Sequence, residues 1–295
     1  MFDYRQLEAL GAVIDCGGFD RASDILGLTQ AAVTLRIKQL ETFAGKPLLI
    51  RSNPPVPTEE GRILHTHFKK IRLLEEDLDK EWNKGVLEKP LPIGVNASTL
   101  GSWFLPALRY IMKSTLVDIH VGEAKVVHDL LQQGSLAGCL SIRASSSRGC
   151  YVEYLGQLVL RCIASRDFKQ RHFPQGVTAE AMKSAPAILF HQESQMMQFY
   201  QKTALNITPF DVPAHVIPSQ DEYLKMIMDG AAYGFLPESL FKRHQADGEL
   251  IDLSPLSPIE LPQYWHRWGM ESEKLELITM KIREEARASL QQNKS

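Results

Sequence analysis

The first sixty residues place short apolar stripes between glycine breaks, which is the pattern of several short helices. The first stripe consists of Leu7, Leu10, Val13 and Ile14, at helical spacing, and Gly17-Gly18 ends it. A second short helix around Ala22 stops at Gly27, and Thr29 caps a third. The inward positions of the third helix are Val33, Ile37 and Leu40. A short helix, a glycine turn and a longer capped helix predict a helix-turn-helix unit.

A proline-rich segment and one long helix follow. The segment SNPPVP (52–57) cannot continue a helix or a central strand, because proline lacks the N–H donor and fixes φ, so it predicts a wing or loop. Thr58 then caps a helix with Glu59 and Glu60 in its first turn, where the helix dipole favours anions. Its apolar seam is Leu64, Phe68, Ile71, Leu74, Leu78 and Trp82. A seam this long favours pairing with a second copy, and packing onto its own domain is the alternative.

The remainder of the chain predicts an α/β domain. GVLEKPLP (85–92) is typical of a hinge. Beyond it, apolar segments such as LPIGVNA, VDIHVGE and AGCLSI alternate with helical ones, which predicts open sheets with helices on both faces. The late segments AAYGFLP and LPQYWHRW are predicted strands, and a final helix is predicted from about Lys274 to Gln291.

Composition excludes several classes of protein. No stretch of the 295 residues approaches the roughly 18 apolar residues of a membrane span, so we expect no membrane partner. The N-terminal MFDYRQLEAL is acidic and polar, unlike a signal peptide, which favours the cytoplasm. The four cysteines form no CxxC pair, so buried free thiols are expected, with a redox pair between Cys139 and Cys150 or Cys162 as the alternative.

Motifs of catalysis are missing from the sequence. It contains no GxSxG, Walker loop, HExxH or dinucleotide fingerprint. His65 and His67 stand two apart on a predicted helix, so they point to different sides and cannot share a metal ion. We therefore expect no enzyme activity, no cofactor and no metal site.

Charge is sorted locally although the formal net charge is only −2. Residues 30–51 carry four basic residues against one acidic residue, whereas residues 1–29 carry two basic against five acidic. Cations on the third helix and wing suit DNA phosphates, and the outer N-terminal surface of that helix suits base edges. The candidate DNA-binding residues are Gln30, Ala31, Thr34, Arg36, Lys38 and Arg51. A solvated helix with scattered charge is the alternative.

A family resemblance adds to this interpretation. The stretch GGFDRASDILGLTQAAVTLRIKQLETFAGKPLLIR…PTEEG resembles the LysR-type transcriptional regulators, and LPIGVNASTLGSWFLPAL, FPQGVTAEAM, DGELIDLSP and YWHRW extend the likeness to the branch of arginine- and lysine-export regulators. The pattern is not followed throughout. Ser23 stands where alanine is usual, and Leu35 stands where many members carry a polar residue that reaches DNA.

The resemblance implies a domain plan. It comprises a winged helix-turn-helix domain (1–58), a dimerising linker helix (59–84), a hinge (85–91) and an effector-binding domain (92–295) with two lobes, like a periplasmic binding protein. Lobe I would span about 92–162 and 266–295, and lobe II about 163–265. The chain would cross between the lobes near 162–166 and 261–267.

A small effector is then expected between the lobes. A helix starting near Ser98 and Thr99 suits a carboxylate, although plain N-capping by either is the alternative, and Glu123 could face a cationic group. By resemblance, Ser141, Ile142 and Ser219 with its neighbour Gln220 line the cleft. His191, followed by Gln192, stands where close relatives are expected to carry an acid, so it could reject a basic ligand or simply bond a nearby loop. The candidate effector residues are Ser98, Thr99, Glu123, Ser141, Ile142, His191, Gln192 and Ser219.

Together these features predict a dimeric or tetrameric regulator of transcription. Its expected partners are double-stranded promoter DNA, a small-molecule effector for which lysine and arginine are the candidates, a second copy of the chain, and RNA polymerase. A two-fold dimer implies half-sites a helical turn or a multiple apart. The alternatives are an architectural nucleoid protein, which the resemblance to a chromosome-initiation inhibitor suggests, and a solute-binding protein whose N-terminal helices mediate assembly.

Overall fold

Three short helices form the N-terminal unit. The structure, a computed structural model, describes residues 1–82, 89–146, 149–192, 194–245 and 248–292. Helices α1 (Tyr4–Cys16), α2 (Phe19–Leu26) and α3 (Gln30–Ala44) pack around one apolar cluster. The Thr29 hydroxyl accepts the Ala32 N–H at 3.2 Å and caps α3. The buried residues of α3 are Val33, Ile37 and Leu40, so the predicted inward stripe is confirmed.

The predicted wing is a small hairpin that leads into the long helix. Strand β1 (Leu49–Ile50) pairs antiparallel with β2 (Val56–Pro57), and α4 (Glu59–Glu81) follows. The Thr58 hydroxyl accepts the Gly61 N–H at 3.1 Å and caps α4, as expected. A Cβ atom on Gly61 would lie 2.0 Å from the Leu48 carbonyl oxygen, so only glycine lets the helix approach the wing this closely.

The apolar seam of α4 divides between two environments. Leu64 and Phe68 pack into the N-terminal cluster. Farther along, Leu74, Leu78 and Trp82 are 46%, 44% and 60% exposed. The first half of the seam thus follows the alternative, packing on its own domain, and the second half is open to a second copy. The predicted end of this helix (83–84) and most of the predicted hinge (85–91) lie outside the described residues.

The C-terminal domain is built on a seven-stranded sheet in the order β10-β6-β11-β5-β3-β4, with β9 also pairing with β6. Its strands are β3 (Leu91–Val95), β4 (Val117–Val121), β5 (Gly138–Ser141), β6 (Cys150–Ser165), β9 (Gly234–Pro237), β10 (Leu250–Asp252) and β11 (Ile259–Trp268). Strands β7 (Ala187–Leu189) and β8 (Ala214–Val216) pair parallel as a second, small sheet. The helices are α5 (Ala97–Thr99), the π-helix η1 (Leu100–Phe104), α6 (Leu105–Leu108), the 3-10 helix η2 (Ile111–Lys113), α7 (Ala124–Gln132), α8 (Arg166–His172), α9 (Ala179–Met182), α10 (Met196–Thr203), α11 (Gln220–Met228), α12 (Glu238–Gln245) and α13 (Glu273–Ser289).

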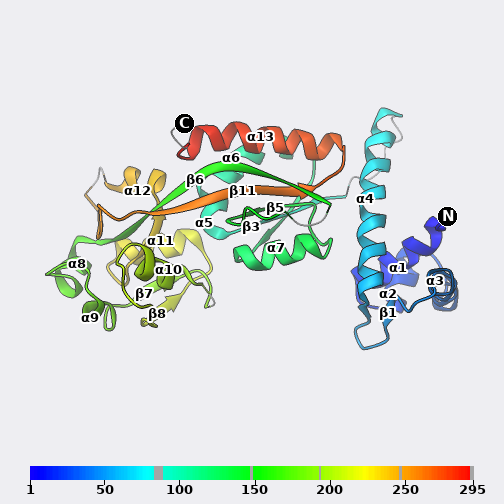
Figure 1. The fold of residues 1–295 in the computed structure, drawn as a ribbon, viewed down its shortest axis with the longest axis horizontal. Coiled ribbons are helices and arrows are strands. Elements are labelled where there is room, and N and C mark those ends of the chain that lie inside the picture. The colour runs from blue at the N-terminus through cyan, green and yellow to red at the C-terminus, as the bar shows by residue number, and fades with distance from the viewer. Residues whose placement is uncertain (83–88, 147–148, 193, 246–247, 293–295) are drawn as a thin grey trace.

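Two long strands join the lobes. Figure 1 shows β6 and β11 running side by side through both of them. β11 pairs with β5 from Tyr264 onward, and β6 pairs with β9 from Leu160 onward. Between these points, residues 156–160 of β6 pair with residues 259–263 of β11. Gln157 also forms a bridge to Gln291 on its other side. The first crossing therefore lies earlier than the expected 162–166, and the second overlaps the expected 261–267.

The helix after β3 differs from expectation. It begins at Ala97, and its cap is Asn96, whose Oδ1 accepts the Thr99 N–H at 2.8 Å, rather than Ser98 or Thr99. After three residues it passes into the π-helical turn η1. The single predicted helix is therefore a series of short turns. Among the described residues, no helix has the length and apolarity needed to cross a membrane.

Candidate DNA interface and effector site

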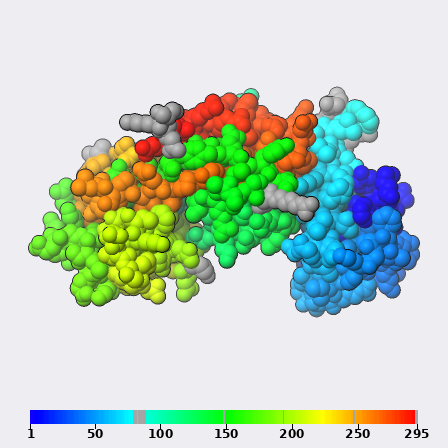
Figure 2. All heavy atoms as spheres, in the orientation of Figure 1, coloured from blue at the N-terminus to red at the C-terminus, as the bar shows by residue number. Residues whose placement is uncertain are grey.

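The outer face of α3 presents the residues predicted to meet base edges. Gln30 and Ala31 are exposed, and Thr34 is half-buried one turn later. Figure 2 shows the helix-turn-helix unit at one end of the molecule, beside the effector domain, so this end is accessible to a duplex. Leu35 is 56% exposed, so this surface also carries an apolar side chain.

The cations of this face stand in different environments. Lys38 is exposed and Arg36 is half-buried. Arg51 on the wing lies 4.0 Å from Glu41, and its side chain is 54% exposed. Glu41 has a structural role, because its Oε1 accepts hydrogen bonds from the backbone N–H groups of Leu48 at 2.9 Å and of Leu49 at 3.4 Å. The carboxylate thus holds the wing onto α3, and Arg51 is presented at the junction of the two.

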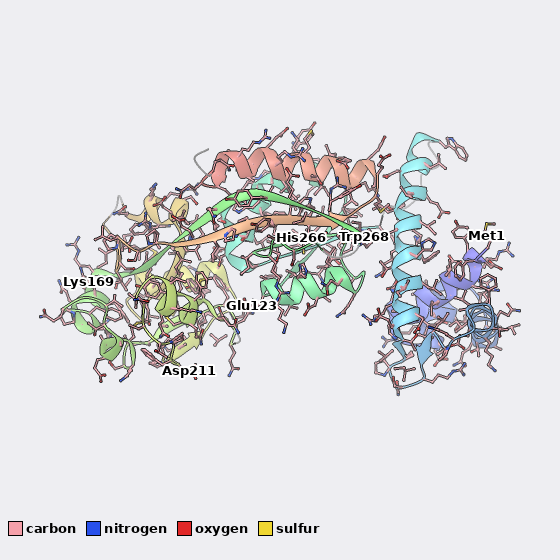
Figure 3. All side chains as sticks on the ribbon, viewed as in Figure 1. Met1, Glu123, Lys169, Asp211, His266 and Trp268 are labelled. Atoms are coloured by element: carbon pink, nitrogen blue, oxygen red, sulfur yellow. The ribbon has the colours of Figure 1, made fainter. Side chains whose placement is uncertain are left out.

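Lobe I brings the first group of predicted effector residues to one edge. Strands β3, β4 and β5 are parallel neighbours, so their carboxyl ends meet at the same edge. Ser98 and Thr99 follow β3, Glu123 follows β4, and Ser141 and Ile142 end β5. In Figure 3, Glu123 lies at the end of α7 that is nearest lobe II. The topology therefore brings together all five residues predicted on lobe I.

Two hydroxyls at this edge are engaged inside the protein. Thr99 is fully buried, and its Oγ1 donates to Gln263 Oε1 of β11 at 3.3 Å. Ser141 is 1% exposed, and its Oγ accepts the Arg143 N–H at 3.2 Å. Thr99 and Ser141 consequently shape the site, whereas Ser98, which is half-buried, and Ile142, which is 40% exposed, face outward.

Lobe II contributes a second edge of parallel strands. His191 and Gln192 follow β7, and Ser219 follows β8. Ser219 is exposed at the start of α11, and its hydroxyl does not cap that helix. His191 Nε2 is buried and bonds to no described residue, so a loop bond from this nitrogen is not observed within the described chain. Gln192 is exposed.

The two edges meet where η1 approaches α11. A Cβ atom on Gly101 of η1 would lie 1.7 Å from Gln220 Oε1 of α11, so the Gln220 side chain lies directly on the Gly101 backbone. This contact places the end of β3 against the start of α11. Sequence reasoning named Gln220 only as a neighbour of Ser219, and it missed Asn96 and Gln263. Asn96 could have been found as a capping residue after a strand, but nothing in the sequence marks Gln263.

Two imidazoles are buried beneath the lobe I edge. The rings of His128 and His266 lie 5.0 Å apart. His266 Nε2 donates to the Arg143 carbonyl oxygen at 2.8 Å, which leaves Nδ1 unprotonated in the neutral ring. Burial lowers the pKa of both histidines, so both are neutral at pH 7. The described residues contain no group of three or more His, Cys, Asp or Glu side chains that could hold a metal ion.

The four cysteines are free thiols in this structure. Cys139 and Cys162 are buried, as the sequence predicted, whereas Cys16 and Cys150 are half-buried. Burial raises the pKa of the Cys139 thiol to about 12, so almost none of it is thiolate at pH 7.

Known proteins match this chain over almost its whole length. Residues 4–62 match the bacterial regulatory helix-turn-helix protein, lysR family, and residues 84–277 match the LysR substrate binding domain. The chain is 35% identical over 295 residues to the HTH-type transcriptional regulator ArgP of Photobacterium profundum, covering 98% of this chain and 99% of that one. It is 37% identical to ArgP of Erwinia tasmaniensis, covering 94% and 93%.

Solved structures show the same architecture. ArgP from Mycobacterium tuberculosis superposes with a TM-score of 0.89 at 28% identity, covering 99% of this chain and 100% of that one. Full-length LysG from Corynebacterium glutamicum with bound effector Arg superposes with a TM-score of 0.80 at 26% identity, covering 98% and 100%.

These matches confirm the predicted fold class and the prediction that the chain is not an enzyme. Regulators of this kind bind DNA and small-molecule effectors and form oligomers. The chain belongs to the LysR family of DNA-binding transcriptional regulators.

Proposed function

We propose that this protein regulates transcription in response to a basic amino acid, arginine or lysine, bound between the two lobes. The observation that carries the proposal is the likeness over 98% of the chain to a LysG structure with bound effector Arg. The two facing edges of parallel strands support it, because ligands of α/β sheets bind outside the carboxyl ends of the strands. The protein would act in the cytoplasm, where it would bind promoter DNA. RNA polymerase would be its protein partner at the promoter.

On the DNA side, α3 would enter the major groove. Gln30 can bond an adenine edge, while Ala31 and the Thr34 methyl group can contact thymine methyl groups. The cations Arg36, Lys38 and Arg51 would bind phosphates and set the register. The exposure of Gln30, Ala31, Lys38 and Arg51 supports this assignment.

On the effector side, polar groups of both lobes would hold the ligand. Glu123 would attract the cationic side chain of the ligand, and the Ser98 and Ser219 hydroxyls would bond its α-carboxylate. His191 Nε2, buried without a partner among the described residues, would take up a hydrogen bond from the ligand. A ligand that contacts both lobes favours the arrangement in which both contacts form, and only this difference in affinity shifts the equilibrium.

Binding to the effector site can be tested by thermal shift with each of the twenty amino acids. Arginine or lysine should raise the unfolding temperature, because ligand binding stabilises the folded state, and Glu123→Gln should remove most of the rise. The matched control is Glu271→Gln, a change of the same charge at an exposed position of lobe I. A shift with some other amino acid and none with arginine or lysine would contradict the proposed effector class.

Binding to DNA can be tested by gel shift with Arg36→Ala and Arg51→Ala. Each should weaken binding to all duplexes and reduce the salt dependence by about one counterion, because a phosphate contact is lost. The control is Lys183→Ala, which removes an exposed cation just after α9, far from α3 along the chain. Unchanged affinity in both variants would contradict the interface. Occupancy spread evenly along a genome, rather than at few promoters, would favour the architectural alternative.

A further inference from the structure

A cavity lies against the crossing strands, between α12 and the residues at the end of α13, and we call it the rear pocket. Its volume is about 610 Å³. Strand β6 lines it with Gln157, Val159 and Arg161, and β11 lines it with Glu260. Its other walls are the start of α12 and residues 289–291, at and just beyond the end of α13. This volume falls within the range of small-molecule sites in proteins.

The rear pocket and the proposed effector site occupy opposite faces of the crossing strands. Successive residues of a strand point to opposite faces, so Glu260 and Gln263 point away from each other. The register between β6 and β11 is regular from Ile259 to Gln263, since its irregularity comes only after Gln263. Gln263 bonds Thr99 on the effector side, whereas Glu260 lines the rear pocket.

The walls of the rear pocket belong to different lobes. Helix α12 packs on β9, β10 and β6 of lobe II. Gln291, which follows the end of α13, is joined to β6 by a pair of backbone bonds, Gln157 N–H to Gln291 O at 2.8 Å and Gln291 N–H to Gln157 O at 3.0 Å. Figure 1 shows α12 and this end of α13 on the same side of the crossing strands. A rotation about those strands that closes the effector site therefore moves the walls of the rear pocket apart.

The rear pocket contains hydrogen-bond acceptors that no described donor satisfies. Arg161 bonds Glu238, and its Nη1 lies 3.3 Å from Asp252 Oδ2, while Lys242 lies 3.1 Å from Glu238 Oε2. Both cations are thus matched. In contrast, Gln157 Oε1 is buried and accepts no hydrogen bond from a described residue, while Glu260 is exposed and forms no ion pair with one. A buried acceptor without a partner costs free energy that a donor-bearing ligand would recover.

We propose that the rear pocket binds a small organic cation with primary ammonium or guanidinium groups and no carboxylate, held by the exposed Glu260 carboxylate and by the Gln157 amide, whose buried Oε1 turns into the pocket to accept a hydrogen bond from the ligand. Glu260 and Gln157 both lie on the crossing strands, and the ligand is much smaller than the cavity, so it contacts the two walls as well only when they close on it. Because closure at the rear opens the front, the ligand opposes binding at the effector site. The coupling is reciprocal, so each ligand weakens the other by the same factor.

Calorimetric titration of the full-length protein with 1,4-diaminobutane tests the site. We expect binding that Glu260→Gln weakens about ten-fold or more, the usual effect of losing one hydrogen bond to a charged group. Glu271→Gln, which removes an exposed carboxylate outside the pocket, should leave the affinity unchanged. The neutral analogue 1,4-butanediol should not bind. Absence of diamine binding, or equal affinity in the wild type and Glu260→Gln, would overturn the proposal.

A second titration separates the two sites. In saturating 1,4-diaminobutane, the Kd for arginine should rise in the wild type and stay constant in Glu260→Gln. Loss of diamine binding in Glu123→Gln would place the diamine in the effector site and overturn the rear pocket. Diamine binding that depends on Glu260, in a protein that binds no arginine, would support the rear pocket while removing the proposed effector.

Discussion

The buried ion pair between the linker helix and the effector domain offers a sharp test of the structure. Lys274 Nζ lies 2.7 Å from Glu76 Oε2, and the two side chains are only 2% and 11% exposed. Beside them, the Glu273 N–H donates to Asp77 Oδ2 at 3.1 Å, so a carboxylate of α4 caps the start of α13. These contacts attach the helix that follows the DNA-binding unit to lobe I.

We predict a large cost for removing the Lys274 charge. Loss of one partner of a buried pair costs about 3–5 kcal/mol, because the remaining charge stays out of water. Lys274→Met should lower the free energy of separating α4 from lobe I by that amount, a factor of about a hundred or more, because it removes the partner of the largely buried Glu76 carboxylate. The double variant that also carries Glu76→Met should recover most of the loss, since well-packed apolar residues often replace a buried pair without cost.

Hydrogen exchange of the Glu273 amide measures this opening, because its hydrogen bond to Asp77 breaks when α4 leaves lobe I. Glu284→Met is the matched control on α13, since Glu284 pairs with Lys281 at the surface, where the side chains are 55% and 27% exposed. Its cost should stay below about 1 kcal/mol. If Lys274→Met changes the protection of Glu273 no more than Glu284→Met does, the pair is not buried in solution and the reasoning fails.

Three further predictions follow from single contacts. Gly61→Ala should lower the stability of the DNA-binding unit by about 1–3 kcal/mol in thermal unfolding, because its Cβ would meet the Leu48 carbonyl oxygen. Burial lowers the pKa of His266 and His128, so the unfolded chain binds more protons. Stability should therefore be full above pH 6.5 and fall below it, and His266→Gln should flatten the urea midpoint between pH 7.5 and 5.5. Cys139 should not react with a thiol reagent at pH 8 until the protein unfolds.

Each of these has its own control. Gly18→Ala should leave the wing intact, because a Cβ there would meet no heavy atom within 4 Å. If the urea midpoint of His266→Gln depends on pH as strongly as that of the wild type, other groups cause the pH dependence. Cys16 is half-buried and should react with the reagent ahead of Cys139, and comparable rates for the two would contradict the packing around β5.

The sequence alone determined the parts of the molecule that rest on contacts close along the chain. Caps at Thr29 and Thr58, the stripe from Val33 to Leu40, and the glycine that ends each short helix are all local signals. Gly17, Gly27 and Gly45 follow α1, α2 and α3 with positive φ, which glycine adopts without strain. Alternation of apolar strands and helices likewise predicted the α/β domain, because each element needs one buried face.

Tertiary structure decided where distant segments meet. Glu76 and Lys274 are 198 residues apart, Thr99 and Gln263 are 164 apart, and no periodicity in either segment marks the pairing. The chain crosses between the lobes where β11 stops pairing with β5 and β6 starts pairing with β9. The position of the crossing therefore depends on the partners of both strands, and the sequence of one strand does not reveal it. The rear pocket arises for the same reason: its walls come from both lobes, and their separation is set by how the two pack about β6 and β11.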